Sequence, residues 1–287
     1  MPFLGYQECL RRLRDQIAAG RPIIGAGAGT GISARFAERG GVDLIVIYNS
    51  GRFRMAGRPS TSGMMPYGDA NAIVVDMARE VLPVVKDTPV LAGVCATDPF
   101  RMMRTFLPQL KEMGFDGVQN FPTVGLIDGT FRQIIEEQGM GIGNEVEMIA
   151  HAHRLEMLTC AYVFDEENAA EFTRAGADIV VAHLRTTVGG SSTLERTTVV
   201  SLDEAVGRVQ AMRDAAVAAN PDVIVLCHGG PIAQPEDAQY VLQRTRGVSG
   251  FLGASSIERL ATEQAIETRA RRFKSIEIGG GRMTPPR

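Results

Sequence analysis

Residues 223–231 read VIVLCHGGP, and residues 248–260 read VSGFLGASSIERL. Each stretch begins as an apolar run typical of a buried strand and breaks at a cluster of Gly and Ser, after which a helical pattern follows. This order predicts two consecutive strand–loop–helix units near the end of the chain. Backbone N–H groups at such helix starts favour an anion, so a ligand carrying a phosphate or a carboxylate is expected there.

The same order of elements repeats along the whole chain. The apolar runs show little polar alternation, as is typical of parallel strands buried on both faces. Eight such runs occur, at residues 22–28, 42–48, 89–95, 115–121, 158–164, 177–183, 223–228 and 248–253. Eight alternating units fit closure into a barrel better than an open sheet. The sequence therefore predicts an α/β fold, the (β/α)8 TIM barrel.

Helical periodicity accounts for most of the remaining chain. Six helices are predicted between the strands, at residues 72–85, 100–113, 144–156, 167–175, 202–219 and 235–244. An amphipathic segment at residues 6–19 is expected to cap the N-terminal mouth of the barrel. No low-complexity linker divides the chain, so residues 1–287 are predicted to form a single domain, with an N-terminal helix in residues 1–20 and a loose Gly/Pro-rich tail at 279–287.

The amino-acid composition limits the classes of molecule that are expected to bind this protein. The 287 residues are 45% hydrophobic and 22% charged, an ordinary globular balance, and the formal net charge is −3. Because no global positive field is present, neither nucleic acid nor an anionic membrane is an expected partner. Four cysteines without CxxC spacing, and no long apolar run at the N-terminus, predict a cytoplasmic protein.

The carboxyl ends of the first two predicted strands offer polar groups, and a barrel of this type carries its reactive groups at such ends. The first strand ends at Gly27, which leaves room for a ligand beside the backbone. The second is followed by Asn49, Ser50 and Gly51, which are predicted to bind substrate.

The segment at residues 52–69 is rich in Gly, Pro, Ser and Met and is predicted to be a long loop, serving as a lid or an interface arm. Its Arg52, Arg54 and Arg58 are candidates to clamp an anion, and exposed loop arginines are the alternative. This loop and the C-terminal helix both favour a homo-oligomer.

The third and fourth strands end in further candidates. Asp98 is a candidate acid–base group and the one candidate metal ligand, while an N-cap for the following helix is an equal alternative. Asn120 is placed to hydrogen-bond a carboxylate or an enolate. No HExxH motif or paired His/Asp spacing is present, so no transition-metal site is predicted.

Two of the four histidines, His183 and His228, end neighbouring predicted strands. A buried structural histidine is the default for either alone, but their shared location favours general acid–base catalysis by at least one of them. Arg185 follows His183 and is predicted to stabilise negative charge. The Gly/Ser/Thr-rich residues 186–193 form a second possible anion cradle.

The loops after the last two strands are predicted to hold the anion itself. They supply backbone N–H groups and hydroxyls from Gly229, Gly230, Gly253, Ala254, Ser255 and Ser256.

Several longer strings carry a resemblance to a known family. They are NFPTVGLIDG (120–129), GMGIGNEVEMI (139–149), YVFDEENA (162–169), ADIVVAHLRTTVGG (177–190), CHGGPIAQPEDAQYVL (227–242) and GFLGASSIERL (250–260). Together they resemble the phosphoenolpyruvate hydrolase-like TIM-barrel family, which also supplies the C-terminal barrel of certain plant antiviral-resistance proteins. The resemblance covers nearly the whole chain.

This resemblance implies distant kinship with the phosphoenolpyruvate mutase/isocitrate lyase superfamily, which acts on C–C or C–P bonds next to a 2-oxo acid. That superfamily holds Mg²⁺ with an Asp-x-Asp pair after strand three, where this chain has Gly93 and Cys95. Its strand-four Glu-Asp is replaced here by Gln119 and Asn120. A hard cation prefers carboxylate oxygens, so no cofactor is predicted beyond a weak Mg²⁺ site implied by the kinship.

Three hypotheses follow for the function. The first is a hydrolase of a small phosphorylated or phosphonylated 2-oxo or enol acid, similar to phosphoenolpyruvate or phosphonopyruvate, with the phosphate held by the loops after strands seven and eight. The second is a non-catalytic sensing or scaffold barrel that binds a small anion. The third is a metal-independent C–C lyase. No lysine ends a predicted strand, so the third hypothesis excludes a Schiff-base mechanism.

Overall fold

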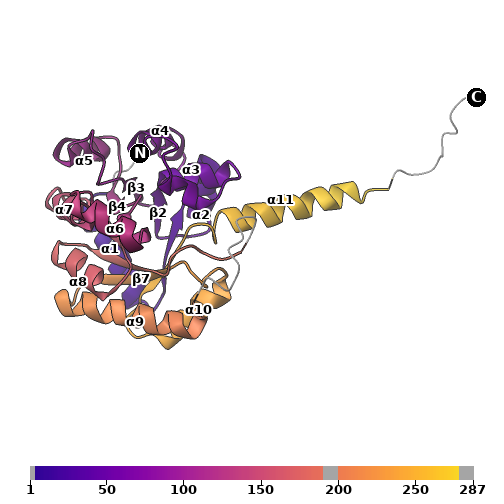
Figure 1. Cartoon of the computed structure of the whole chain (residues 1–287). Helices are drawn as coiled ribbons and strands as arrows, with labels where there is room; N and C mark the ends of the chain where they lie inside the picture. The colour runs from indigo at the N-terminus through magenta and orange to yellow at the C-terminus, as the bar shows by residue number, and fades with distance from the viewer. Residues whose placement is uncertain (1–3, 190–199, 278–287) are drawn as a thin grey trace, which may run out of the picture.

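The structure, a computed structural model, describes residues 4–189 and 200–277. Its centre is a closed barrel of parallel strands in the order β1 to β8 (Figure 1). The strands are β1 (Ile23–Gly27), β2 (Leu44–Ile47), β3 (Val90–Val94), β4 (Gly117–Asn120), β5 (Leu158–Val163), β6 (Ile179–His183), β7 (Ile224–His228) and β8 (Gly250–Gly253). Each lies within a predicted apolar run, so the predicted (β/α)8 fold is confirmed.

Helices surround the barrel, and all six helices predicted between strands are present. They are α4 (Ala70–Val81), α5 (Met103–Glu112), α7 (Ile142–Arg154), α8 (Glu166–Arg174), α9 (Leu202–Ala219) and α10 (Pro235–Arg244). The α4 helix ends before its predicted limit because Pro83 lacks an N–H group and clashes with the preceding turn. Within the described residues, no helix is long and apolar enough to cross a membrane.

The prediction of a long loop at residues 52–69 is wrong. Helix α3 (Asn49–Met55) starts directly after β2, and a 3₁₀ helix, η1 (Ser60–Met64), follows it. Two further helices, α2 (Gly31–Arg39) and α6 (Gly129–Glu137), were not among the predicted ones. Close backbone contact fixes the start of α3, since a Cβ on Gly51 would lie 2.9 Å from Gly29 Cα. Such packing between distant segments leaves no periodic signal.

Helix α1 (Tyr6–Ala18) lies at the N-terminal end of the barrel, as predicted. The Tyr6 hydroxyl donates to Asp178 at 2.7 Å, and the backbone N–H of Leu4 donates to Asp116 at 3.1 Å. Both carboxylates directly precede strands, Asp116 before β4 and Asp178 before β6. The N-terminal segment is thereby tied to two strands. The predicted tail at residues 279–287 lies outside the described residues.

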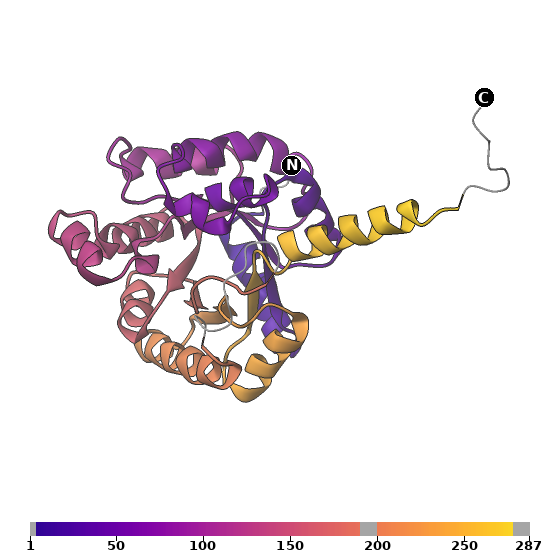
Figure 2. The same cartoon turned by 45° about the vertical axis from the view of Figure 1, so that its right-hand side comes forward.

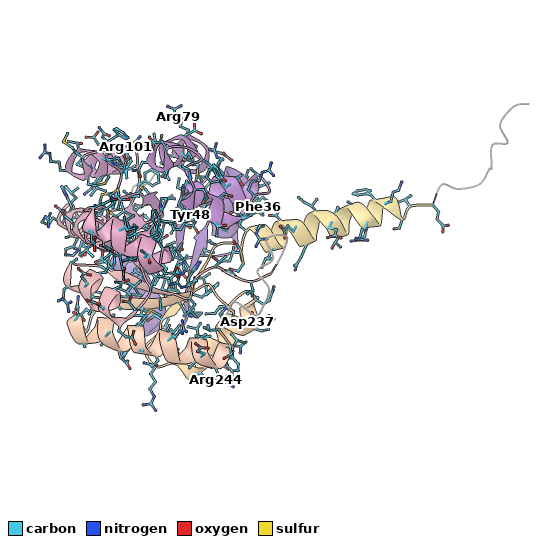
Figure 3. The ribbon with its side chains drawn as sticks, viewed as in Figure 1. Phe36, Tyr48, Arg79, Arg101, Asp237 and Arg244 are labelled. Atoms are coloured by element: carbon cyan, nitrogen blue, oxygen red, sulfur yellow. The ribbon has the colours of Figure 1, made fainter. Side chains whose placement is uncertain are left out.

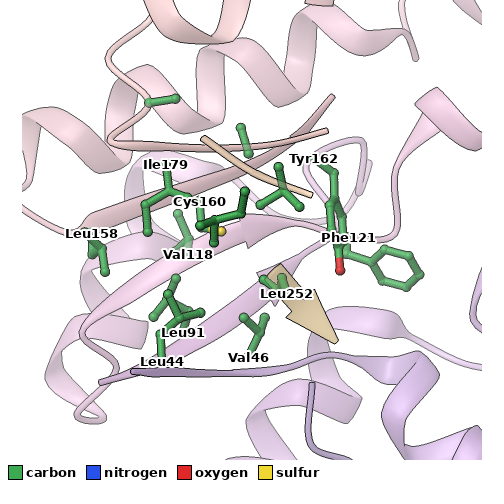
Figure 4. Close-up of a cluster of buried hydrophobic side chains, with 14 of the residues drawn as sticks. Leu44, Val46, Leu91, Val118, Phe121, Leu158, Cys160, Tyr162, Ile179 and Leu252 are labelled. Carbon is green, nitrogen blue, oxygen red and sulfur yellow. The ribbon is translucent and has the colours of Figure 1, made fainter. Parts of the chain in front are cut away.

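Apolar side chains fill the barrel, as expected when closure brings strand faces together. Figure 4 shows part of this cluster, with Leu158 at one end and Tyr162 beside Phe121 at the other. The rings of Phe121 and Tyr162 are 6.2 Å apart. Since Phe121 directly follows β4 and Tyr162 lies near the carboxyl end of β5, the apolar core ends in aromatic rings beneath the mouth of the barrel.

Helix α11 (Arg259–Lys274) differs from the other helices. It follows β8 but extends away from the barrel, as two views of the molecule agree (Figures 1 and 2). Its apolar side chains Ile266 and Phe273 are 65% and 66% exposed. The last strand of the barrel is therefore not covered by the helix that follows it in the sequence.

The close packing of β1 against β8, which closes the barrel, predicts that Gly250 cannot be replaced by a residue with a side chain. A Cβ there would lie 1.9 Å from the carbonyl oxygen of Ile23, which cannot move without breaking the ladder between these strands. We expect Gly250→Ala to lower the melting temperature by many degrees, or to prevent folding. Gly207→Ala is the matched control, because nothing lies within 4 Å of a Cβ inside α9, and it should stabilise by up to about 1 kcal/mol. Equal melting temperatures for the two variants would contradict this account of closure.

Candidate functional site

A small pocket of about 50 Å³ lies at the carboxyl ends of the strands. Elements distant in the sequence contribute to it: β5, β6 and β7, helix α3, and the segments after β6 and β8. The lining residues are Tyr48, Ser50, Arg54, Ser60, Thr61, Met64, Phe121, Leu126, Tyr162, His183, Arg185, Thr186, Thr187, His228, Ala254 and Ser255. Figure 3 shows Tyr48 in the middle of the molecule, whereas Arg79 and Arg244 lie at its edge.

Two histidines form the centre of the pocket. His183 and His228 are register partners on the adjacent strands β6 and β7, and their ring centroids are 4.5 Å apart. Each is only 6% exposed. The ring of Tyr162 lies 4.6 Å from His183 and 5.1 Å from His228, so the three rings pack against one another.

Hydrogen bonds give the two imidazoles opposite roles. Nδ1 of His183 accepts from the backbone N–H of Arg185 at 2.9 Å, so its neutral ring carries the proton on Nε2. Nδ1 of His228 faces the carbonyl oxygen of Leu252 at 2.5 Å and must carry the proton, which leaves Nε2 as an acceptor. His183 thus offers a donor and His228 an acceptor at the outer ring nitrogen.

Burial keeps both imidazoles neutral. It lowers the pKa of His228 to about 4. The pKa of His183 is held well below its usual range, first by burial and then by the neighbouring His228 and Arg185. Burial also raises the pKa of Tyr162 well above its usual range, so its hydroxyl stays protonated. At neutral pH the centre of the pocket is therefore an uncharged set of donors and acceptors.

The charge beside this centre is Arg54, which is 2% exposed. Its Nε and Nη2 atoms bind Oε2 of Glu258 at 2.7 and 2.6 Å. The third nitrogen, Nη1, is buried and has no partner at hydrogen-bond distance and angle among the described residues, and the same holds for the Tyr162 hydroxyl, although the Tyr48 side chain acts on the pKa of both groups. Tyr48 lies next to Arg54, with its ring centroid 5.7 Å from Cζ. A buried donor without a partner is costly, so Nη1 favours an acceptor from a ligand.

Hydroxyl groups line the opposite wall of the pocket. The Ser50 hydroxyl donates to the carbonyl oxygen of Ser60 at 2.6 Å. The hydroxyls of Ser60 and Ser255 are 3.0 Å apart, which joins η1 to the segment after β8. Small polar side chains of this kind suit the oxygen atoms of a carboxylate or a phosphoryl group.

The structure brings together six of the residues predicted to form the site. Ser50, His183, Arg185, His228, Ala254 and Ser255 all line the pocket. Arg185 lies at the rim, where its side chain is 50% exposed and is 3.4 Å from Asp128. Part of the predicted cradle at 186–193 also reaches the pocket, through Thr186 and Thr187, but residues 190–193 lie outside the described part of the chain.

Several other predicted residues have structural contacts instead. Gly230 donates its N–H to the carbonyl oxygen of Arg185, and Gly229 has φ of 79° and packs on the same loop. The Asn120 side chain bonds Glu145 and both backbone groups of Tyr162. Gly27, Gly51, Gly253 and Ser256 are not among the lining residues. Gly230 therefore uses its N–H within the protein, whereas no bond donated by the N–H of Gly229 occurs among the described backbone contacts.

Asp98 lies apart from the histidines. It lines a neighbouring pocket of about 520 Å³ together with Asn49 and Cys95. Its carboxylate accepts from Asn71 at 2.9 Å and pairs with Arg101 at 2.5 Å, and these contacts hold its pKa below the usual value despite partial burial. The N-cap alternative is wrong, because Met102 is the N-cap of α5 and the helix begins at Met103. Asp98 instead bonds the backbone N–H of Phe100 at 2.9 Å.

The donor set near β3 and β4 does not fit Mg²⁺. A Cβ on Gly93 would lie 2.4 Å from Cβ of Tyr48, so Tyr48 occupies the space that a carboxylate side chain would need. Gln119 is fully buried and bonds the thiol of Cys160 at 3.4 Å. No group of three or more His, Cys, Asp or Glu side chains in residues 4–189 and 200–277 is arranged to hold a metal ion. We therefore derive no step through a cation.

Sequence reasoning missed four important residues. Tyr48 and Tyr162 lie at strand ends and look like ordinary core aromatics in a sequence. Arg54 was considered only as part of a loop clamp, although it is fully buried on a helix. Glu258 stands next to a helical pattern and gave no sign that it pairs with an arginine 204 residues earlier. The position of both tyrosines at the carboxyl ends of predicted strands, Tyr48 after β2 and Tyr162 in β5, was the available signal.

The fold and the pocket define a TIM barrel with a small polar ligand site at the carboxyl ends of its strands. The model of the phosphoenolpyruvate hydrolase-like family matches residues 8–276. The chain belongs to this family.

Two tomato (Solanum lycopersicum) proteins are similar in sequence. The ToMV susceptible protein tm-1(GCR26) is 64% identical over 269 residues, and the ToMV resistance protein Tm-1(GCR237) is 63% identical over the same length. Each match covers 94% of this chain but 35% of the tomato protein. The chain thus spans about a third of the length of these relatives.

Solved structures share the fold at low sequence identity. Phosphonopyruvate hydrolase, solved with oxalate and Mg²⁺, has a TM-score of 0.59 at 17% identity, covering 93% of this chain and 87% of that one. Oxaloacetate acetylhydrolase has a TM-score of 0.58 at 16% identity, covering 99% and 93%. The lyase of 2,3-dimethylmalate, described as a PEP mutase/isocitrate lyase superfamily member, has a TM-score of 0.56 at 15% identity, covering 98% and 91%.

Because Arg54 and Glu258 form a buried ion pair, we expect the effects of replacing the two residues on the free energy of unfolding to be strongly coupled. Removing one partner leaves a buried charge, so Arg54→Met should lower the free energy of unfolding by about 3–5 kcal/mol. The double variant Arg54→Met, Glu258→Gln should lose less than the sum of the single variants. Chemical unfolding of all four proteins measures this cycle. Arg208→Met, which breaks the exposed pair with Glu204, should change stability by about 0.5 kcal/mol or less. Additive losses at Arg54 and Glu258 would contradict the pairing.

The depressed pKa of His228 predicts a loss of stability in acid. An unfolded histidine takes up its proton near pH 6.5, whereas folded His228 stays neutral to about pH 4. The unfolded state binds more protons in this window. As the pH falls from 7 to 5, His228 therefore lowers the free energy of unfolding by about 2 kcal/mol.

Glu145, whose pKa burial raises to about 7, acts in the opposite direction, so a difference between variants must be measured. We expect His228→Asn to lose less stability than the wild type on going from pH 7 to pH 5. His151→Asn, on the outer helix α7, should behave as the wild type. An unchanged pH dependence in His228→Asn would show that His228 is not held neutral.

Proposed function

We propose that this chain is an enzyme that hydrolyses the bond to phosphorus in a small 2-oxo or enol acid, similar to phosphonopyruvate or phosphoenolpyruvate. The observation that supports it is the neutral pair of His183 and His228, with opposite hydrogen-bonding roles, beside a buried arginine whose Nη1 lacks a partner. Such a pair suits the transfer of one proton between two points of a substrate.

In the binding step, the acid would contact the uncharged walls of the pocket and the two buried groups that lack a hydrogen-bond partner. Arg54 Nη1 and the Tyr162 hydroxyl would take the carboxylate of the acid. The hydroxyls of Ser50 and Ser255 would take the phosphoryl oxygens, with Arg185 at the rim. The pocket of about 50 Å³ is smaller than such an acid, so the half-exposed Arg185 side chain must move to admit it.

The proposed hydrolysis needs one general base and one hydrogen-bond donor. A water oxygen attacks phosphorus and its proton passes to Nε2 of His228. The bond from phosphorus to carbon, or to the enol oxygen, breaks, and the electron pair leaves on the enolate of pyruvate. The N–H at Nε2 of His183 stabilises the enolate oxygen. The proton on His228 then returns to the enolate, so the products are pyruvate and phosphate.

This reaction is supported by two solved structures that share the fold, a phosphonopyruvate hydrolase and an oxaloacetate acetylhydrolase. Where a bound cation would stabilise the enolate, this chain offers Arg54, Tyr162 and His183. The proposal therefore assigns to protein hydrogen-bond donors the charge stabilisation of the reaction.

A second candidate is a non-catalytic barrel that binds a small anion, and the missing acidic pair near β3 favours it. A metal-independent C–C lyase is the third, since it would form the same type of enolate. We also propose that the protein forms a homo-oligomer and has no nucleic acid or membrane partner.

Three measurements test the proposed function. We expect phosphonopyruvate or phosphoenolpyruvate to raise the melting temperature of the wild type, and phosphate to be released from at least one of them. His228→Asn should retain the melting shift but lose at least a hundredfold in kcat, because it removes the base and leaves the arginine. Arg54→Met should lose the shift itself. His151→Asn is the control and should keep both.

The outcomes separate the candidates. A melting shift without turnover of any such acid would overturn catalysis in favour of a binding protein. Cleavage of a C–C bond in oxaloacetate without phosphate release from the other acids would favour the lyase. Absence of any shift and any turnover would reject the assignment of this pocket to small acids.

A further inference from the structure

Residues 121–127, which directly follow β4, form a wall between two pockets, and we call them the wall segment. On one side, Phe121 and Leu126 line the small pocket that contains the two histidines. On the other side, four residues line the neighbouring pocket of about 520 Å³: Pro122, Thr123, Val124 and Ile127. A shift of the wall segment towards the larger pocket would therefore join the two spaces and expose the histidines.

One buried carboxylate binds this segment from a different element. Glu145 lies on α7 and is only 1% exposed. Its Oε2 accepts from Nδ2 of Asn120 at 2.7 Å and from the hydroxyl of Thr123 at 2.8 Å. Its Oε1 accepts from the backbone N–H of Val124 at 2.7 Å. Two of the three donors belong to the wall segment, and the third is the last residue of β4.

The wall segment has weaker anchors elsewhere. Nη1 of Arg132 donates to the carbonyl oxygen of Val124 at 2.8 Å, but Arg132 belongs to α6, which directly follows the segment and can move with it. Nη1 of the half-exposed Arg185 lies 3.4 Å from the carbonyl oxygen of Leu126. Glu145 is therefore the buried polar group that ties the segment to a helix outside its own loop.

Burying this carboxylate is costly, and its hydrogen bonds compensate only in part. Burial raises the pKa of Glu145 to about 7, although three donors and the positive charge of Arg132 on α6 act against the rise. The thiol of Cys95, which follows β3, also faces Glu145, and burial raises the pKa of that thiol, so it stays neutral. The proposed reaction makes no use of Glu145.

We propose that Glu145 is a positioning residue of the candidate site, whose carboxylate holds Phe121 and Leu126 in place as one wall of the histidine pocket. It acts through the wall segment and is not among the residues that line the pocket. The inference rests on the proposed function only in taking this pocket as the ligand site.

Glutamine at this position would not replace the carboxylate. It keeps the size of the side chain but turns one of two acceptors into a donor. The backbone N–H of Val124 cannot reverse its direction, and Asn120 is fixed by two bonds to the backbone of Tyr162. Whichever way the amide is turned, its NH₂ group therefore faces at least one donor of the wall segment or of Asn120.

Chemical modification of His228 tests whether Glu145 holds the wall. Diethyl pyrocarbonate acylates the unprotonated nitrogen of a neutral imidazole, and His228 offers Nε2 because its Nδ1 faces the carbonyl oxygen of Leu252. We expect Glu145→Gln to speed this reaction at least about tenfold, since a bond to a charged group shifts an opening equilibrium by such a factor. Thr123→Val removes one donor, leaves Glu145 in place and should also speed it. Mass spectrometry of the peptides gives the rates.

Three controls separate a local opening from unfolding. Glu147→Gln changes an exposed carboxylate on the same helix and should leave the rate at His228 as in the wild type. The exposed His153 should react equally in all variants. Cys227, buried beside His228 on β7, should stay closed to N-ethylmaleimide in every variant. Reaction of Cys227 together with His228 would show unfolding and overturn the positioning role.

The pH profile adds a readout that a loss of stability alone would not give. The closed state binds the proton of Glu145 more tightly than an open state in which Glu145 meets water, so opening is favoured as the pH rises through about 7. In acid the wall stays closed, because the hydroxyl of Thr123 can rotate and accept the new proton. His228 remains neutral from pH 6 to pH 8, since its pKa is about 4.

We therefore expect the rate at His228 in the wild type to rise about tenfold from pH 6 to pH 8, and the rate in Glu145→Gln to be the same at both. An unchanged rate in Glu145→Gln, or a pH profile like that of the wild type, would overturn the proposal. None of these rates requires turnover, so a protein that hydrolyses none of the proposed acids would contradict the proposed reaction and leave the role of Glu145 standing.

Discussion

The buried ion pair between Arg54 and Glu258 connects the parts of this molecule that matter most for its function. Arg54 belongs to the helix after β2, and Glu258 directly precedes the helix after β8, so the pair joins segments on both sides of β1. Glu258 also accepts from the backbone N–H of Gly29 at 2.6 Å, which adds the segment after β1 itself. Two buried charges are tolerable only when paired in this way. The shape of the barrel mouth therefore depends on their remaining together.

The pair also sets the electrostatic character of the pocket. Burial is the largest cause of the low pKa values of the two histidines, and the positive charges of Arg185 near His183 and of Arg54 near His228 lower them further. In the proposed function, affinity for an acid would come from directed donors such as Arg54 Nη1 more than from net positive charge. This arrangement favours a small ligand that satisfies several donors at once over a larger polyanion held by charge.

Periodicity and strand-end reasoning predicted the parts of the structure that depend on local sequence. The eight strands, the bounds of α9 and α10 and the pairing of His183 with His228 follow from apolar runs and from the parallel order of the barrel. Helix α3, the partner of Arg54 and the bond from Gly230 to Arg185 in the segment after β6 depend on contacts between distant segments. No single stretch encodes those contacts. Placing Asn120 in the site failed for the same reason, since its amide is consumed by Glu145 and Tyr162.

The segment after β8 joins the chemistry of the site to the outer surface within a few residues. Ser255 lines the pocket, Glu258 holds Arg54, and Arg259 begins the helix that leaves the barrel. A shift of α11 on its surface would pull first on Glu258 and through it on Arg54. If Arg54 binds the ligand as proposed, a displacement of about 1 Å would change which ligand oxygen its Nη1 reaches. The start of α11 and the pocket are thus joined by direct contacts through this pair.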